Sequence, residues 1–278
     1  MPEMFAKDLR FVATDLIRWI ANGFSLPVIV VSPDFPSKKT TIYKIAARLG
    51  YRLTNKTVKN PKLVIYFDDI TFGSSEKIRK KFPGRHIINQ DCIDISKNHV
   101  DAIHQRVFGY NTFVDPLTYQ GTAVQKSDIN ALHDGRIIQC PVTVQEEKSV
   151  YQVLIDNSHD DRYVVDMRVP VYNGEIPLLY FKYKVYERRF TNDVSESALV
   201  KDFHSVLSED EIEKIKRFTE EMKVEFCELD VLRNKTDGRI YIIDVNKTPY
   251  GPPSGLSQEA RDEALNILAA AFRKHFLK

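Results

Sequence analysis

Residues 226–253 read FCELDVLRNKTDGRIYIIDVNKTPYGPP, and this segment is the most informative part of the chain. It contains two apolar runs, residues 227–232 and residues 240–245, with the polar turn 234–238 between them. Two strand-like runs joined by a short turn that contains glycine are typical of a β-hairpin. We therefore predict two adjacent antiparallel strands here.

Three oxygen-bearing side chains belong to this hairpin. Asp230 lies in the first run, and Asp244 and Asn246 lie at the end of the second. Residues two apart in a strand point to the same face, so Asp244 and Asn246 project together and the hairpin brings Asp230 beside them. Two carboxylates and an amide oxygen are suitable ligands for Mg²⁺. The alternative is a surface hairpin with ordinary polar positions. The apolar runs favour burial instead, where unpaired charge is costly.

The composition is that of a folded protein with balanced charge. The chain has 278 residues, of which 43% are hydrophobic and 28% charged, and its formal net charge is +2. This length suits one large domain or two to three small ones, and the composition argues against disorder. The charge gives no reason to expect binding to nucleic acid or to a membrane. The sequence leaves the oligomeric state open, a homo-oligomer included.

Cysteine usage and the N-terminal segment bear on the compartment. Cys92, Cys140 and Cys227 are widely spaced and indicate neither a disulfide framework nor a zinc site. Residues 1–24 have the pattern of an amphipathic helix rather than of a signal peptide. No run is long enough to span a membrane. We expect a cytoplasmic protein.

The N-terminal part of the chain has an α/β pattern. Residues 27–32 (PVIVVS) and 63–67 (LVIYF) are apolar runs typical of buried parallel strands. Between them we predict a helix over residues 37–49, capped by Ser37 and followed by Gly50. Together these elements form a βαβ unit, the start of an open α/β sheet.

The middle of the chain is predicted to be mostly antiparallel β-structure. Asn173-Gly174 is a strong signal for a tight hairpin turn. A helix is predicted over residues 208–222, because Ser208 and Glu211 have the spacing of a capping box, and a terminal helix over residues 257–276. The other predicted elements are strands at residues 51–53, 87–89, 123–125, 137–144, 151–155, 163–171 and 177–185, and a helix over residues 96–107.

The order of these elements and the closing DGRIYIIDVN hairpin resemble the ATP-grasp superfamily. The resemblance implies a fold of mixed α/β and α+β class, in which a Rossmann-like N-terminal domain precedes an ATP-grasp fold of two α+β subdomains. We place the N-terminal domain at residues 1–95, the lid subdomain at 96–160, and the C-terminal subdomain with the metal site at 161–278. ATP would lie between the two subdomains.

The resemblance assigns roles to the hairpin residues and to two lysines. The family's late acidic strand pattern is met by Asp244 and Asn246, and its earlier acidic ligand by Asp230. These three residues would hold Mg²⁺ or Mn²⁺. Lys126, at a strand end, and Lys97, at a helix start, resemble the lysines that bind nucleotide phosphates. The alternative for each lysine is a solvated surface position.

Two further strands are assigned in the same way. Gln152 and Leu154, in the run YQVLI, resemble the strand that holds adenine through backbone hydrogen bonds, although a plain core strand fits the pattern equally. Arg168 resembles the arginine of the family's D-x-R-V strand. It would stabilise charge on the transferring phosphoryl group, because a guanidinium pairs bidentately with phosphate. The alternative is a structural pair of Asp166 with Arg168.

Several basic residues and one loop have less definite interpretations. Residues 127–136 would form the phosphate-covering loop, although they contain one glycine where most such loops contain several. Lys182 and Lys184 are interpreted as a solvated strand edge, and Arg188 and Arg189 as candidate substrate residues. Lys247 and the proline-rich residues 248–255 would form either a rim where substrate meets the γ-phosphate or an ordinary linker.

These assignments predict an ATP- and Mg²⁺-dependent ligase. Members of the family typically phosphorylate a carboxylate to an acylphosphate, which an amine or another nucleophile attacks, releasing ADP and phosphate. The expected substrates are therefore a small-molecule or peptide-like carboxylate and a nucleophile. The alternatives are a small-molecule or sugar kinase of the same type and a non-catalytic nucleotide-binding module. Retention of all the predicted metal ligands argues against the last.

Overall fold

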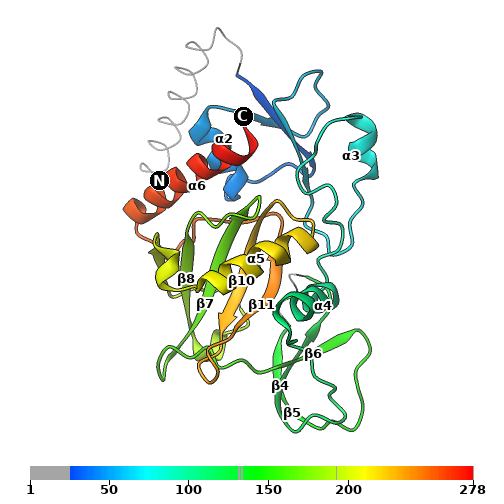
Figure 1. The fold of residues 1–278 in the computed structure, drawn as a ribbon, viewed down its shortest axis with the longest axis vertical. Coiled ribbons are helices and arrows are strands. Elements are labelled where there is room, and N and C mark those ends of the chain that lie inside the picture. The colour runs from blue at the N-terminus through cyan, green and yellow to red at the C-terminus, as the bar shows by residue number, and fades with distance from the viewer. Residues whose placement is uncertain (1–25, 131, 133, 192, 278) are drawn as a thin grey trace, which may run out of the picture.

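A computed structural model describes residues 26–130, 132, 134–191 and 193–277 of the chain. The helix expected over residues 1–24 lies outside these residues. Within them, the chain forms three sheets, of three, five and three strands, and helices that pack on them (Figure 1). The sequence prediction of a mixed α/β fold is confirmed, while the assigned domain boundaries stay predictions.

The N-terminal sheet is parallel and has the strand order β2-β1-β3. It consists of β1 (Val28–Pro33), β2 (Arg52–Thr54) and β3 (Leu63–Phe67), with helix α2 (Thr41–Leu49) between β1 and β2. Gly50 ends α2 in the left-handed region, at φ 78°, where glycine is favoured. The predicted βαβ unit is confirmed, and its assignment to a Rossmann-like domain remains a prediction.

The start of α2 differs from the sequence prediction. Ser37 does not cap the helix: its carbonyl accepts hydrogen bonds from the backbone and hydroxyl of Thr40, and the helix begins at Thr41. Helix α3 (Glu76–Lys81) was not expected from the sequence. The predicted strand at residues 87–89 is reduced to one bridge, between Ile88 and Ile65 of β3.

The small sheet is antiparallel, in the order β5-β4-β6. It consists of β4 (Gly121–Ser127), β5 (Arg136–Cys140) and β6 (Ser149–Val153). Strand β5 is shorter than the predicted run 137–144, because Pro141 has no N–H to continue the ladder. Helix α4 (Lys97–Phe108) precedes the sheet and confirms the predicted helix, and the Ser96 side chain caps its start.

The large sheet has the order β11-β10-β7-β8-β9, and all its strand pairs are antiparallel. Asn173 and Gly174, at φ 49° and 82°, turn the chain after Tyr172, the last residue of β7, as predicted. One strand, β9, was not expected from the sequence, and it makes β8 an interior strand. The strands are β7 (Tyr163–Tyr172), β8 (Leu179–Val185), β9 (Glu196–Val200), β10 (Phe226–Arg233) and β11 (Ile240–Asn246).

Helices cover one face of the large sheet and join it to the N-terminal sheet (Figure 1). Helices α4 and α5 (Glu209–Glu221) pack on the large sheet and enclose the largest apolar core. Helix α6 (Gln258–Phe276) packs against α2 and closes a second core between the two sheets. Two 3₁₀ turns, Tyr186–Arg188 and Phe203–Ser205, complete the order. In the described residues, every helix is too short or too polar to cross a membrane.

Candidate active site

A cavity of about 690 Å³ lies where the three sheets meet. Its lining comes from the segment before α2, the end of β3, the small sheet, the cavity-facing side of the large sheet, and the chain after β11. The residues predicted to bind the metal, the nucleotide and the transferring phosphoryl group all line this cavity. They are Lys97, Lys126, Gln152, Leu154, Arg168, Asp230, Asp244 and Asn246.

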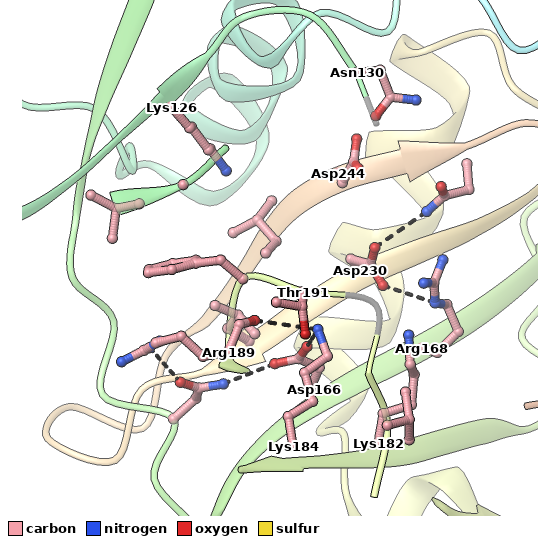
Figure 2. A pocket seen from close by; sticks show the side chains of 18 of the residues that line it. Lys126, Asn130, Asp166, Arg168, Lys182, Lys184, Arg189, Thr191, Asp230 and Asp244 are labelled. Atoms are coloured by element: carbon pink, nitrogen blue, oxygen red, sulfur yellow. Dashed lines mark hydrogen bonds and ion pairs between the residues drawn. The ribbon is translucent and has the colours of Figure 1, made fainter. Parts of the chain in front are cut away.

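The polar side of the cavity is one face of the large sheet. Side chains alternate along each strand, so a strand with an apolar core on one face presents its other residues to the opposite face. On β10, Leu229 and Val231 face the helices, while Asp230 lines the cavity. On β7, Val169 faces the helices and Arg168 lines the cavity. The acidic and basic residues therefore meet on one surface (Figure 2).

A β-bulge in β11 places the metal-ligand candidates on this face. Asp244 pairs with Asp230 across the hairpin, but Ile242 pairs with the next residue, Val231, so Ile243 is an extra residue in β11. Before the bulge, the even-numbered residue Ile242 faces the helices and lies in the apolar core. After the bulge, the even-numbered residue Asp244 faces the other way and lines the cavity. Without the bulge, the carboxylate of Asp244 would point into the apolar core.

Arg168 is held by carboxylates on the neighbouring strand. Its Nε lies 2.8 Å from Oδ1 of Asp230 and 3.9 Å from Oε2 of Glu228. Burial opposes ionisation of Asp230, yet Arg168 beside it and nearby Lys182 hold the pKa of that carboxyl below its usual value. Among the described residues, no hydrogen bond is formed by the terminal nitrogens of Arg168, and its ion pairs run through Nε. The terminal nitrogens are therefore available to an anion in the cavity.

Asp244 is a buried carboxylate whose charge is only partly compensated. Burial and the neighbouring carboxylate of Asp230 raise the pKa of Asp244, and the basic side chains of Lys97, Lys126 and Arg168 only partly offset this. Asn246 lies on the same strand face and its Nδ2 is 3.4 Å from Oδ2 of Asp230. A divalent cation between these oxygens would remove the repulsion between the two carboxylates.

The two predicted phosphate lysines approach this acidic pair from the small sheet and from α4. Burial and the charge of nearby Lys97 lower the pKa of Lys126 to about 8. Lys126 has no hydrogen-bond or ion-pair partner within the described part of the chain, and it points into the cavity (Figure 2). Lys97 is buried and its Nζ donates to the carbonyl of Ile129 at 2.8 Å. Burial lowers the pKa of Lys97 as well.

Gln152 in β6 and Leu154 just after it both line the cavity. The Gln152 side chain is buried, and its Nε2 donates to the Thr112 hydroxyl at 2.6 Å. That side chain is therefore occupied by a structural contact, and only the backbone of this strand is left for a ligand. Leu154 is followed by Ile155, whose side chain packs with Leu232 in a small apolar cluster. This apolar end suits a flat aromatic ring.

Lys182 and Lys184 were assigned wrongly to a solvated strand edge. Strand β8 lies between β7 and β9, so it is not an edge, and both lysines point into the cavity (Figure 2). Lys184 pairs with Asp166 at 2.8 Å, so the suggested Asp166–Arg168 pair is also wrong. Burial and the charge of Arg168 lower the pKa of Lys182 to about 8. Alternation along β8 correctly predicted that Lys182 and Lys184 share a face. Only the pairing of β8 with β9 shows that β8 is an interior strand.

The remaining basic residues divide between the cavity and the surrounding structure. Arg189 lines the cavity, and its Nη2 donates to Oδ1 of Asn157 at 2.8 Å, whereas Arg188 is exposed and pairs with Asp193. Lys247 is fully buried and pairs with Asp68 of the N-terminal part at 2.5 Å. The expectation that Lys247 lies on the cavity rim is therefore wrong, although the residues after it do line the cavity.

Neither a family model nor a curated protein sequence matches the chain. Solved structures do match. D-alanine–D-alanine ligase from Bacillus anthracis, complexed with ATP, is 14% identical, with a TM-score of 0.56 over 91% of this chain and 98% of that one. The ATP-grasp ligase PsnB, complexed with minimal precursor, Mg and ADP, is 12% identical, with a TM-score of 0.55 over 90% and 100%. The RimK domain ATP-grasp protein from Sphaerobacter thermophilus is 10% identical, with a TM-score of 0.51 over 91% and 100%.

The chain has the ATP-grasp fold. The cavity lies between the small sheet, which belongs to the segment 96–160 that we predicted to be the lid, and the large sheet of the C-terminal part. The fold is confirmed by these structures, while the role of each residue in it remains a prediction.

The donors at the ATP-grasp cavity fit a hard divalent cation. No group of three or more His, Cys, Asp or Glu side chains that could hold a metal occurs in the described ranges. The predicted set is different in kind, because it combines the carboxylates of Asp230 and Asp244 with the amide oxygen of Asn246. Such all-oxygen sets, completed by phosphate and water, suit Mg²⁺ and Mn²⁺.

Proposed function

We propose that the protein is an ATP- and Mg²⁺-dependent ligase that activates a carboxylate as an acylphosphate. The observation that carries the proposal is the convergence of Lys126, Arg168, Asp230, Asp244 and Asn246 on one cavity of an ATP-grasp fold. The acidic residues Asp230 and Asp244 belong to β10 and β11, and the basic residues Lys126 and Arg168 belong to β4 and β7. This arrangement suits a nucleotide triphosphate with its cation.

The reaction would proceed by two displacements. A carboxylate oxygen of the first substrate attacks the γ-phosphorus, the bond from that phosphorus to the bridging oxygen breaks, and ADP leaves. A nucleophile such as an amine then attacks the acyl carbon, the acyl C–O bond breaks with release of phosphate, and the amine loses a proton to solvent or to a base. A bound Mg²⁺ or Mn²⁺ supplies charge neutralisation at the phosphates.

The chain's own residues would contribute position and charge. Asp230, Asp244 and Asn246 hold the cation, and Lys97 and Lys126 face the phosphates from the lid side. Arg168 presents its terminal nitrogens to the oxygens of the transferring group, where developing charge is greatest. Backbone groups of Gln152 and Leu154 would border the adenine.

The substrate class is proposed from the neighbouring structures and from the cavity. PsnB was solved with peptide precursor and D-alanine–D-alanine ligase was solved with ATP. Both are named as ligases, and this favours a carboxylate acceptor, small or peptide-like, over the hydroxyl acceptor of a kinase. The cavity is large enough for a nucleotide and part of a second ligand.

Product analysis tests the proposal. Purified protein with Mg²⁺ and ATP is incubated with pools of carboxylates, amines and sugars, separately and combined, and ADP and phosphate are measured. ADP with free phosphate, appearing when an acid and a nucleophile are both present, supports the ligase. ADP without free phosphate, formed with a sugar or alcohol alone, would support a kinase. Nucleotide binding without any ADP would support a non-catalytic module.

The metal assignment makes a separate prediction for Asp244. Asp244→Ala is expected to lower turnover by at least about a thousandfold, because the cation that neutralises the phosphates loses one of its protein ligands. Circular dichroism and the unfolding temperature should stay close to those of the unsubstituted protein, since Asp244 forms no ion pair in the described structure and its burial is only partly compensated. Full activity in this variant would remove Asp244 from the site.

A further inference from the structure

Asn130 has a buried oxygen without a partner at the edge of the cavity. Its side chain is 8% exposed and lines the cavity, and its Oδ1 has no hydrogen-bond donor among the described residues. Buried amide oxygens are almost always satisfied, and leaving one unsatisfied costs roughly 1–3 kcal/mol. The position can therefore accept a donor or a cation that is not among the described side chains.

The segment that carries Asn130 is fixed in place. The backbone N–H of Asn130 donates to the hydroxyl of Thr71 at 2.9 Å, and Lys97 donates to the carbonyl of Ile129 at 2.8 Å. Two residues before Asn130, the side chain of Asp128 accepts a hydrogen bond from the backbone N–H of Asn98 at 2.9 Å. Contacts from the N-terminal part and from α4 thus hold this segment over the cavity.

The unsatisfied oxygen faces an acidic side chain. Figure 2 shows the amide of Asn130 and the carboxylate of Asp244 pointing toward one another from opposite sides of the cavity. In this orientation of the amide, the oxygen of Asn130 and the carboxylate of Asp244 are both acceptors, so no hydrogen bond forms between them. The ammonium group of Lys97, which also lines the cavity, already donates to the carbonyl of Ile129. A cation placed between the two oxygens would satisfy both.

We propose that Asn130 is a further ligand of the divalent cation, through its Oδ1, alongside Asp230, Asp244 and Asn246. This rests on the proposed function, because it uses the same cation. It adds a ligand from the segment after β4 to a set that otherwise comes entirely from the β10–β11 hairpin. The cation would then tie the lid side of the cavity to the large sheet.

Mn²⁺ binding tests the proposal without reference to activity. Free Mn²⁺ is followed by its electron paramagnetic resonance signal during titration of the protein, with and without AMPPNP. Asn130→Leu is expected to weaken Mn²⁺ binding by about tenfold or more, because it removes an oxygen ligand at similar volume. Asn130→Asp, which keeps an oxygen at the position, should bind Mn²⁺ at least as tightly as the unsubstituted protein.

Thr71→Val is the matched control. It removes the hydrogen bond to the backbone of Asn130 but leaves the amide oxygen, so it should weaken Mn²⁺ binding by less than about threefold. A loss as large as that of Asn130→Leu would mean that loop anchoring, and not ligation, determines the affinity, and would overturn the proposal.

The unsubstituted protein provides a second measurement, which does not depend on a variant that folds. In protein labelled with ¹³C-asparagine, the side-chain carbonyl signal of Asn130 should shift on saturation with Mg²⁺. An unmoved signal, or Mn²⁺ binding unchanged or tightened in Asn130→Leu, would overturn the ligand role while leaving the proposed function intact. If Mn²⁺ fails to bind the unsubstituted protein even with AMPPNP, the proposed function fails as well.

Discussion

His104 is a buried titratable side chain that lies away from the cavity. It belongs to α4, and its ring stacks on Phe108 at 4.3 Å between centroids and meets Tyr110 edge-on at 5.2 Å. Neither ring nitrogen has a hydrogen-bond partner in the described part of the chain. Burial without compensation lowers the pKa of His104 to about 4.

This histidine makes stability depend on pH. In the unfolded chain its pKa returns to the ordinary 6.5, so the unfolded state binds the extra proton first as the pH falls. The free energy of unfolding therefore falls as the pH drops below 6.5. It stops falling below about pH 4, where His104 is protonated in the folded and in the unfolded state. Between pH 7 and pH 4.5 the loss should be about 2 kcal/mol. Urea unfolding at both pH values measures it.

His104→Phe is the control for that measurement. Phenylalanine keeps the aromatic packing and cannot be protonated, so the free energy of unfolding of the variant should lack this part of the pH dependence. Equal losses in both proteins over this range would show that His104 does not titrate between the folded and unfolded states as described.

At the level of strands, Asn89 joins β10 to the N-terminal part. Its Nδ2 donates to the carbonyl of Phe226 at 2.7 Å, and its Oδ1 accepts from the backbone N–H groups of Glu225 and Phe226 at 2.8 and 2.9 Å. The side chain thus pairs with the backbone where β10 begins. Its φ of 61° is in the left-handed region, which asparagine tolerates better than most residues.

Asn89→Ala should therefore be strongly destabilising. The loss of three buried hydrogen bonds, together with the cost of a left-handed alanine, predicts a decrease of about 3 kcal/mol in the free energy of unfolding. Asn111→Ala, which removes one exposed contact to Phe113, should change it by less than about 0.5 kcal/mol. Denaturant titration compares the two, and equal effects would contradict the role assigned to Asn89.

Several elements could be predicted because their signals are local. The Ser208–Glu211 capping box starts α5, with both reciprocal hydrogen bonds formed. The Asn173-Gly174 turn likewise joins β7 to β8 as expected. Strand β9 and the interior position of β8 could not be predicted, because they depend on pairing with a distant segment. Lys182 was misassigned for that reason.

Across the whole molecule, a buried ion pair connects the N-terminal part to the end of β11. Lys247 is fully buried beside Asp68, which also accepts a hydrogen bond from Tyr66. The next residues repeat the connection, since the Thr248 hydroxyl donates to Asp69 at 2.8 Å. These contacts hold the chain immediately after Asn246 and help to set the position of the candidate metal ligands.

Breaking this pair on one side should cost more than removing both partners. Lys247→Met leaves the Asp68 carboxylate buried and unpaired, and it should lower the free energy of unfolding by about 3 kcal/mol or more. In the double variant Lys247→Met/Asp68→Leu, part of that loss should be recovered because no charge is left unpaired. Urea unfolding of the single and double variants measures the difference, and a double variant less stable than Lys247→Met would contradict this account.

The sequence by itself determined the β10–β11 hairpin and the grouping of Asp230, Asp244 and Asn246. That grouping follows from the twofold period of a strand and from a short turn, both of which are local properties. The same applies to the βαβ unit at the start of the chain, whose strands and helix are marked by runs of apolar residues and by Gly50.

Only the tertiary structure decided which way that group faces and what surrounds it. The extra residue at Ile243 turns Asp244 from the core to the cavity, and a bulge is a property of cross-strand register that no local pattern reveals. Asn130 and Lys182 reach the same cavity from segments far apart in the chain. Their convergence depends on long-range packing, so the site could be identified but not completed from the sequence.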